Sequence, residues 1–140
     1  MTEPTRLTGG CQCGGVRYEI AAPPRGLYVC HCRECQKQSA SAFGISVDVA
    51  ADALRLSRGV PRSWSRPTPH GRLICHFCPD CGSRLWHQSD PPDGGVTIKG
   101  GSLDEPPDLS RAVHIWTKRK LAGVVIPEDA EQWPEEPDAR

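Results

Sequence analysis

The sequence predicts an all-β fold in which two antiparallel sheets pack together with little helix. Apolar and polar residues alternate in short runs, as is typical of strands with one buried face. The 14 glycines and 14 prolines separate these runs, and only one stretch has the composition of a helix. About eight short strands of this kind suffice for two packed layers around a core.

The candidate strands follow from this alternation. Residues 16–21 alternate Val, Tyr and Ile with Arg and Glu, and residues 43–49 place four apolar side chains on one face. Turn residues bound the further candidates, which are residues 54–57, 63–65, 72–77, 84–88, 96–100 and 114–117.

One short helix and an extended tail complete the expected elements. Residues 34–39 predict one or two helical turns that present Cys35. From about residue 127 the chain becomes acidic and rich in proline, so we expect residues 128–140 to be extended. Trp133 either pins this tail to the body or is exposed, and we favour the first because tryptophan usually buries most of its area.

Length and charge limit the possible classes of protein. The 140 residues fit a single domain spanning residues 1–140. The chain has 17 basic residues (Lys and Arg) and 17 acidic ones (Asp and Glu), so it lacks the excess of positive charge that is typical of proteins that bind nucleic acid. No apolar run approaches the length of a membrane span. We therefore expect neither a nucleic acid nor a membrane as partner.

Eight cysteines indicate metal binding. Apolar residues make up 37% of the chain, a thin core that metal ions would help to stabilise. Residues 1–10 contain no apolar segment typical of a secretory signal, so we expect a cytoplasmic protein. Disulfides are disfavoured in that reducing compartment, and the Cys-x-Cys and Cys-x-x-Cys spacings suit metal ligation.

Four of the cysteines form a complete set of ligands. Cys78 and Cys81 have the spacing of a zinc knuckle, in which Pro79 presets one dihedral angle and Gly82 allows a positive φ. In an extended segment, Cys11 and Cys13 would share one face and supply the other half. A shared ion would fasten the first strand to the middle of the chain, so we expect a structural site.

Cys30, Cys32 and Cys35 form a second set that stops at three sulfurs. Three protein ligands leave a position on zinc for water or substrate, which favours a catalytic site. Buried thiolates also need donors and cations nearby, so Arg33 or Lys37 would lie beside them, unless both are simply solvated. Strand alternation turns His31 away from the ion, where it is either a proton shuttle or an ordinary hydrogen-bonded histidine.

Cys75 decides whether the second set is open. It shares a face with Leu73 and Phe77 and has the character of a small core residue, and we favour this reading over a fourth ligand. His76, on the opposite face, and His87, just beyond the knuckle, are the other residues that could approach an ion. A fourth protein ligand would close the site and weaken the interpretation as an enzyme.

The cysteine motifs resemble those of the glutathione-dependent formaldehyde-activating enzyme family. The resemblance spans most of the chain and rests on residues 10–16 (GCQCGGV), 30–37 (CHCRECQK) and 77–83 (FCPDCGS). Residues 114–117 look like the late strand of that family, and residues 126–137 look like its acidic, proline-containing end.

This resemblance implies a fold, a metal content and an activity. The fold would be of the β-tent type, with two zinc ions per chain, and the activity would be that of a carbon-sulfur lyase. Glutathione and formaldehyde would combine reversibly to S-hydroxymethylglutathione. The structural zinc would be held by Cys11, Cys13, Cys78 and Cys81, and the catalytic zinc by Cys30, Cys32 and Cys35.

A mechanism consistent with these residues places the thiol on the open position of the metal, as a thiolate that attacks the aldehyde carbon. The resulting oxyanion needs a proton, and the candidates nearest in sequence are His31 and, as an electrostatic stabiliser, Arg33. An anionic thiol such as glutathione also requires cations. Lys37, Lys99, Lys118 and Arg119 are candidates whose placement depends on the tertiary structure.

A different class of function is a non-catalytic module, stapled by zinc, that binds a protein partner. Fold and family do not fix function, so this alternative stays open beside the enzyme. Metal content together with an assay for the thiol-aldehyde adduct separates the two.

Overall fold

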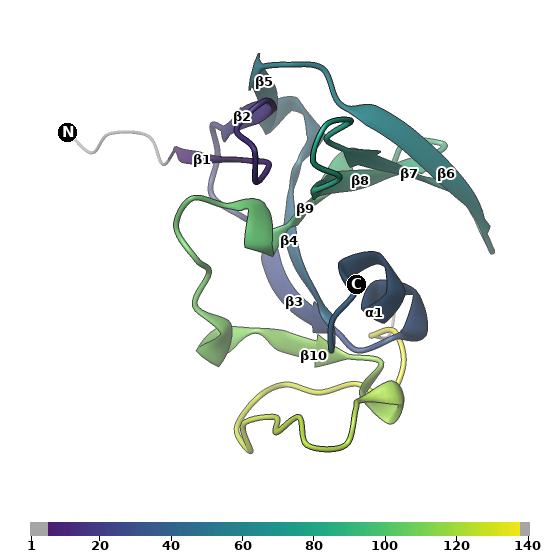
Figure 1. Cartoon of the computed structure of the whole chain (residues 1–140). Helices are drawn as coiled ribbons and strands as arrows, with labels where there is room; N and C mark the ends of the chain where they lie inside the picture. The colour runs from purple at the N-terminus through teal and green to yellow at the C-terminus, as the bar shows by residue number, and fades with distance from the viewer. Residues whose placement is uncertain (1–5, 138–140) are drawn as a thin grey trace.

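The structure is a computed structural model that describes residues 6–137. In this part of the chain, ten strands form two sheets and one short α-helix lies beside them (Figure 1). The prediction of a mostly β fold with two sheets is therefore confirmed. None of the helices in the described residues is long and apolar enough to cross a membrane.

The smaller sheet has three antiparallel strands in the order β1-β2-β5. They are β1 (Leu7–Gly10), β2 (Arg17–Ile20) and β5 (Leu54–Arg58). Alternation along residues 16–21 and 54–57 predicted β2 and β5. The strand β1 was not predicted because its sequence, LTGG, has a single apolar side chain.

The larger sheet has seven strands in the order β10-β3-β4-β9-β8-β7-β6. In chain order they are β3 (Gly26–Cys30), β4 (Gly44–Ala50), β6 (Arg62–Thr68), β7 (Gly71–Phe77), β8 (Arg84–Asp90), β9 (Gly95–Lys99) and β10 (Val113–Ile115). Six of the seven overlap predicted runs, and β3 is the exception.

The strand β10 departs from the prediction in two ways. It pairs in parallel with β3, whereas antiparallel strands were expected throughout. It also begins and ends earlier than residues 114–117. Trp116 adopts a left-handed conformation with φ of 56° and turns the chain out of the sheet.

The helical elements are short. The α-helix α1 begins at Arg33 and ends at Ser39, one residue longer than predicted, and it presents Cys35 as expected. Four 3-10 helices also occur among residues 6–137, and these are η1 (Ala51–Ala53), η2 (Gly100–Ser102), η3 (Leu109–Arg111) and η4 (Thr117–Arg119).

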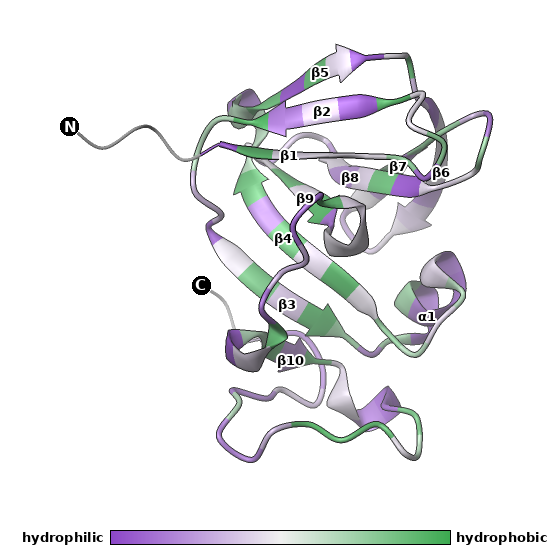
Figure 2. Ribbon diagram, turned by 60° about the vertical axis from the view of Figure 1, so that its left-hand side comes forward, coloured by the Kyte–Doolittle hydropathy of each residue, from purple (hydrophilic) through white to green (hydrophobic). Residues whose placement is uncertain are grey.

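The main core lies between the two sheets. Hydrophobic positions alternate with hydrophilic ones along β4 (Figure 2), and the side chains of Val47 and Val49 are buried in this core. Tyr18 and Ile20 from β2 meet them from the smaller sheet. The opposite face of the larger sheet carries a second cluster around Cys30 and Cys35, against which α1 packs.

The acidic tail runs alongside β10 in the larger sheet. The His114 N–H donates to the Glu131 carbonyl at 2.9 Å, and the Trp133 N–H donates to the His114 carbonyl at 2.9 Å. Trp133 packs against the second cluster, so the preferred reading of this residue is confirmed. Residues 138–140 of the predicted tail, and residues 1–5 at the other end, lie outside the described residues.

Candidate metal centres

The first half of the four-cysteine centre is the turn between β1 and β2. Gly14 donates its N–H to the Cys11 carbonyl at 3.1 Å and adopts a φ of 81°. The Cys11 N–H donates to the Val16 carbonyl at 3.0 Å. Our expectation of an extended segment was therefore wrong, because the hairpin reverses at Cys13 and the turn, not strand alternation, aims both sulfurs inward.

The second half is the turn between β7 and β8. The Cys78 N–H donates to the Ser83 carbonyl at 3.0 Å, and the Gly82 N–H donates to the Cys78 carbonyl at 2.9 Å. Gly82 has the positive φ, 79°, that the knuckle motif predicted. Two tight turns thus bring four thiols together from segments that are distant in sequence.

The spacing of these thiols fits one zinc ion. The Sγ atoms of Cys11 and Cys13 are 3.6 Å apart, and those of Cys13 and Cys78 are 3.7 Å apart. Tetrahedral zinc with Zn–S bonds of about 2.3 Å separates its sulfurs by about 3.8 Å. All four ligand atoms, including Cys81 Sγ, lie within 4.8 Å of one another.

Neighbouring donors stabilise negative charge on this centre. The Val16 N–H donates to Cys11 Sγ at 3.2 Å, and the Ser83 hydroxyl lies 3.3 Å from Cys81 Sγ. Hydrogen bonds from Ser83 lower the pKa of the Cys81 thiol to about 5. Such contacts favour the thiolate form that a metal requires.

The three-cysteine centre forms where β3 passes into α1. Cys30 ends β3, Cys32 caps the N-terminus of α1, and Cys35 lies in the first turn of the helix. The Sγ atoms of Cys30 and Cys32 are 3.4 Å apart, and all three sulfurs lie within 4.8 Å of one another. The Cys35 N–H donates to Cys32 Sγ at 3.3 Å, so the helix cap also orients a ligand.

These three thiols share their protons unequally. Hydrogen bonds from Cys30 and Cys35 lower the pKa of the Cys32 thiol to about 2, while contacts with Cys32 and Cys35 raise the pKa of Cys30. A divalent cation would replace the shared protons, as metal ions do at thiol sites. The geometry and the donor chemistry therefore fit zinc here as well.

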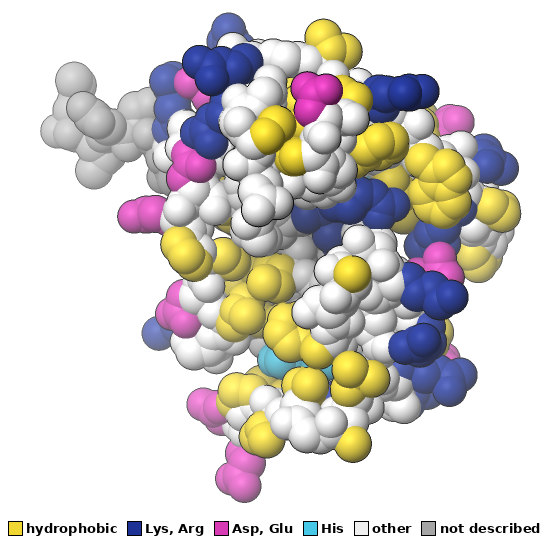
Figure 3. All heavy atoms as spheres, in the orientation of Figure 1, with side chains coloured by type: hydrophobic (Ala, Val, Ile, Leu, Met, Phe, Trp, Pro, Cys, Tyr) yellow, Lys and Arg dark blue, Asp and Glu magenta, His cyan; other side chains and the backbone are white. Residues whose placement is uncertain are grey.

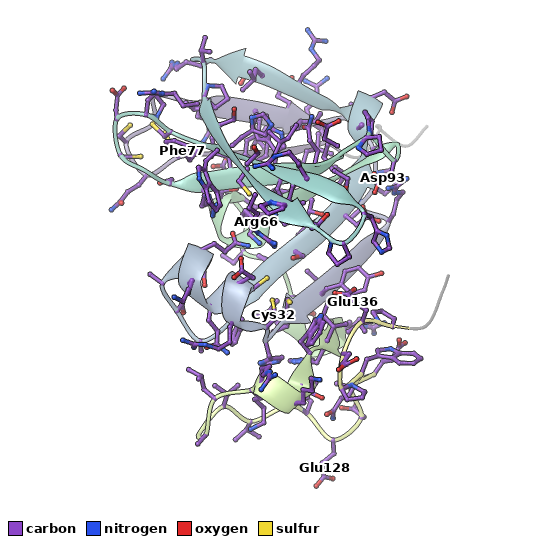
Figure 4. All side chains as sticks on the ribbon, turned by 90° about the vertical axis from the view of Figure 1, so that its right-hand side faces the viewer. Cys32, Arg66, Phe77, Asp93, Glu128 and Glu136 are labelled. Carbon is purple, nitrogen blue, oxygen red and sulfur yellow. The ribbon has the colours of Figure 1, made fainter. Side chains whose placement is uncertain are left out.

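The three sulfurs line a cavity of about 450 Å³ on the face of the larger sheet that carries α1. Its wall includes Tyr28 from β3, His87 from β8, Arg66 from β6 and Glu136 from the tail. Figure 4 places Arg66 and Glu136 around Cys32. Among residues 6–137, no fourth cysteine, histidine or carboxylate joins the three sulfurs.

Cys75 is separate from both sets. It lies buried on β7, opposite Trp64 on β6 and His87 on β8. His76 points to the other face, where its ring stacks on Trp86 with centroids 4.7 Å apart. Burial lowers the pKa of His87 to about 3, so its imidazole is neutral at neutral pH.

The structure places the two predicted catalytic residues away from the sulfurs. His31 is fully buried, and its Nε2 lies 2.9 Å from Nδ1 of His114 in a stacked pair. Arg33 is exposed and donates to the Gln36 side chain. Neither lines the cavity with the three thiols. Their catalytic roles therefore stay predictions.

The buried cation beside the second centre is Lys99, not Arg33 or Lys37, which both lie at the surface. Burial lowers the pKa of Lys99, and the charges of Cys35 and Cys30 act in the opposite direction. A Cβ on Gly44 would lie 3.3 Å from Lys99 Nζ and 3.4 Å from Cys35 Sγ, so glycine lets both approach. Lys99 was among the candidate cations and lay within the predicted strand 96–100, but its position beside the second centre was not predicted.

Comparison with known proteins shows which family the chain belongs to. Residues 6–119 match the family model described as glutathione-dependent formaldehyde-activating enzyme. The chain belongs to this family. Both cysteine sets of this family member lie within the matched residues, whereas the tail that carries Trp133 and Glu136 lies beyond them.

One solved structure shows the same fold. A crystal structure of a Rhodobacter sphaeroides protein is similar with a TM-score of 0.55 and 20% sequence identity. The alignment covers 90% of this chain and 98% of that chain. At this identity the likeness concerns the arrangement of strands alone.

Proposed function

We propose that this chain is a zinc-dependent carbon-sulfur lyase that acts on a thiol-aldehyde adduct. In the forming direction, glutathione would add to formaldehyde to give S-hydroxymethylglutathione. The sulfur–carbon bond forms as the carbonyl π bond breaks, and the thiol proton ends on the new hydroxyl oxygen. Family membership suggests the two substrates, and the site must supply the chemistry.

The observation that carries this proposal is the incomplete ligand set inside a cavity. Cys30, Cys32 and Cys35 supply three sulfurs, and no fourth protein ligand joins them in residues 6–137. The open position would face a hollow of about 450 Å³, large enough for a thiol side chain and a small aldehyde. The four-cysteine centre, in contrast, has its full tetrahedral set and would be structural.

The residues of the cavity have distinct tasks in this proposal. A zinc ion held by the three cysteines would supply Lewis acidity that favours the thiolate form of the substrate. The Gln38 amide donates to Cys35 Sγ at 3.7 Å and orients that ligand. His87, neutral and half-buried in the cavity wall, offers a ring N–H to the oxygen on which negative charge develops.

Proton transfer to that oxygen completes the reaction. His31 and Arg33 remain the residues that the sequence proposed for this step. His87 lines the cavity itself, so it is the nearer candidate for a direct contact, as a hydrogen-bond donor and not as the proton source, because its imidazole is neutral. We propose the cytoplasm as the compartment, because all eight cysteines are unpaired, as in reducing surroundings.

Zinc stoichiometry measured together with an adduct assay tests the proposal. The purified chain should hold two zinc ions and accelerate formation of S-hydroxymethylglutathione, detected by NMR with ¹³C-formaldehyde. One ion per chain would leave only the four-cysteine staple. Two zinc ions without turnover on any thiol would contradict the proposed enzymatic activity and favour a non-catalytic, zinc-stabilised module that binds a protein.

A further inference from the structure

A second hollow lies next to the three-cysteine centre. It is a groove of about 790 Å³ between α1, the knuckle turn and the segment from β9 to η2. Gln38 lines both the groove and the cavity of the three thiols. Gly44 forms part of the groove wall, and a Cβ there would lie 3.1 Å from Cys35 Cβ. The groove therefore lies directly beside Cys35, one of the three proposed ligands.

The groove carries an excess of positive charge. Its carboxylate, Asp104, is paired with Arg17 through contacts of 2.9 and 2.5 Å. Arg84 and Lys99 also line the groove, and in the described part of the chain neither has a carboxylate partner. Figure 3 shows Lys and Arg side chains gathered in the hollow between β6–β8 and α1.

Lys99 is the less usual of these two cations. Its side chain is only 8% exposed, and Nζ has no hydrogen-bond partner among residues 6–137. A buried ammonium without a partner costs stability unless negative charge lies near it. The thiolates of the neighbouring centre supply part of that charge, and an anionic ligand in the groove would supply more.

Arg84 is held in place with its donors available. Its guanidinium lies 5.9 Å from the centre of the Trp64 ring and donates to Gln38 Oε1 at 3.4 Å. Gln38 in turn donates to Cys35 Sγ at 3.7 Å. A planar guanidinium fixed in this way is suited to bind a carboxylate through two parallel hydrogen bonds.

We propose that the groove binds the carboxylate-bearing body of the thiol substrate, with Arg84 contacting a carboxylate and Lys99 adding a buried positive charge. This inference rests on the proposed function, which places the sulfur of the same substrate at the three-cysteine centre. Space for an extended chain exists beside η2, where nothing lies within 4 Å of the position of a Gly101 Cβ. Arg84 and Lys99 thereby select anionic thiols over neutral ones.

Binding of S-methylglutathione and of its diethyl ester to the zinc-loaded chain tests this assignment. The methylated sulfur cannot act as a thiolate, so calorimetry measures the affinity of the groove for the rest of the molecule and not the reaction. The free acid should bind about tenfold to a hundredfold more tightly than the ester, as expected for a charge-assisted hydrogen bond. Arg84→Gln should remove this preference, and Arg84→Lys should keep part of it.

The control is Arg55→Gln on β5, an exposed arginine outside the groove, which should bind like the unmodified chain. Equal binding of acid and ester by the unmodified chain would overturn the inference, as would an unchanged preference in Arg84→Gln. An Arg84→Lys variant that folds, judged by its circular dichroism, but has no preference would also count against it. Binding of the acid without adduct formation would instead contradict the proposed function and leave the groove assigned.

Discussion

Removing one sulfur of the four-cysteine centre should strongly destabilise the fold. In Cys81→Ser, the knuckle can no longer hold the metal together with the turn of Cys11 and Cys13. Cys13 and Cys78 are 65 residues apart in sequence, and Cys11 and Cys78 belong to the main core. A cross-link closing a loop of this size restricts the unfolded chain by about 4 kcal/mol.

This loss is large beside the total stability of a domain, which is about 5–15 kcal/mol. Urea denaturation followed by tryptophan fluorescence measures it. With a denaturant slope of about 2 kcal/mol per molar urea, the midpoint should fall by about 2 M. Atomic absorption should show one equivalent less zinc in the same variant.

Cys75→Ala provides the matched control, because it removes a buried sulfur from β7, the strand that leads into the knuckle turn. Cys75 belongs to neither ligand set, so its loss should lower the free energy of unfolding by only about 1 kcal/mol, with zinc content unchanged. If Cys81→Ser lost its zinc but kept the midpoint of Cys75→Ala, the four-cysteine centre would not be structural.

Three further predictions concern the other centre and the core. Cys32→Ser should abolish adduct formation and lose one zinc while the urea midpoint stays close to that of the unmodified chain; unfolding would count against a purely catalytic role. Gly44→Ala presses a methyl group on Cys35, so chelator competition should show about tenfold to a hundredfold weaker zinc binding at that centre alone; unchanged affinity would contradict this contact. Burial raises the pKa of Tyr18 to about 12, because the buried phenol is favoured in its neutral form. The contribution of this neutral phenol to the free energy of unfolding is therefore complete below about pH 10 and disappears as pH rises through about 12. Over that window the unmodified chain should lose about 2 kcal/mol more than Tyr18→Phe in urea titrations, and parallel curves would argue against it.

Most strands could be predicted because one face of each is buried. Alternation in β2 and β4 is visible in the sequence, and Val47 and Val49 are buried as that pattern requires. β1 was missed because two of its four residues are glycine, which carries no side chain to show a pattern. The parallel pairing of β10 with β3 was also missed, because strand partners far apart in sequence leave no local signal.

The tail was predicted from composition and from one residue. Its proline and acidic residues indicated an extended segment, whereas the structure has a turn at residues 127–130 and bends at residues 134–136. Trp133 indicated an anchor, which the structure confirms. The structure adds the route of the tail along β10 and the position of Glu136 at the cavity of the three thiols. That position depends on backbone hydrogen bonds between distant segments, which composition does not encode.

Residue spacing within the sequence was enough to predict the two cysteine clusters and the family. Cys-x-Cys and Cys-x-x-Cys spacings act within a few residues, where turn and cap geometry fixes the directions of the sulfurs. The surroundings of the three-cysteine centre, in contrast, depend on the tertiary structure. Arg66, Arg84 and Lys99 come from β6, β8 and β9, and strand register brings them to the hollows around α1. Long-range pairing therefore sets the charge around a centre whose ligands are locally encoded.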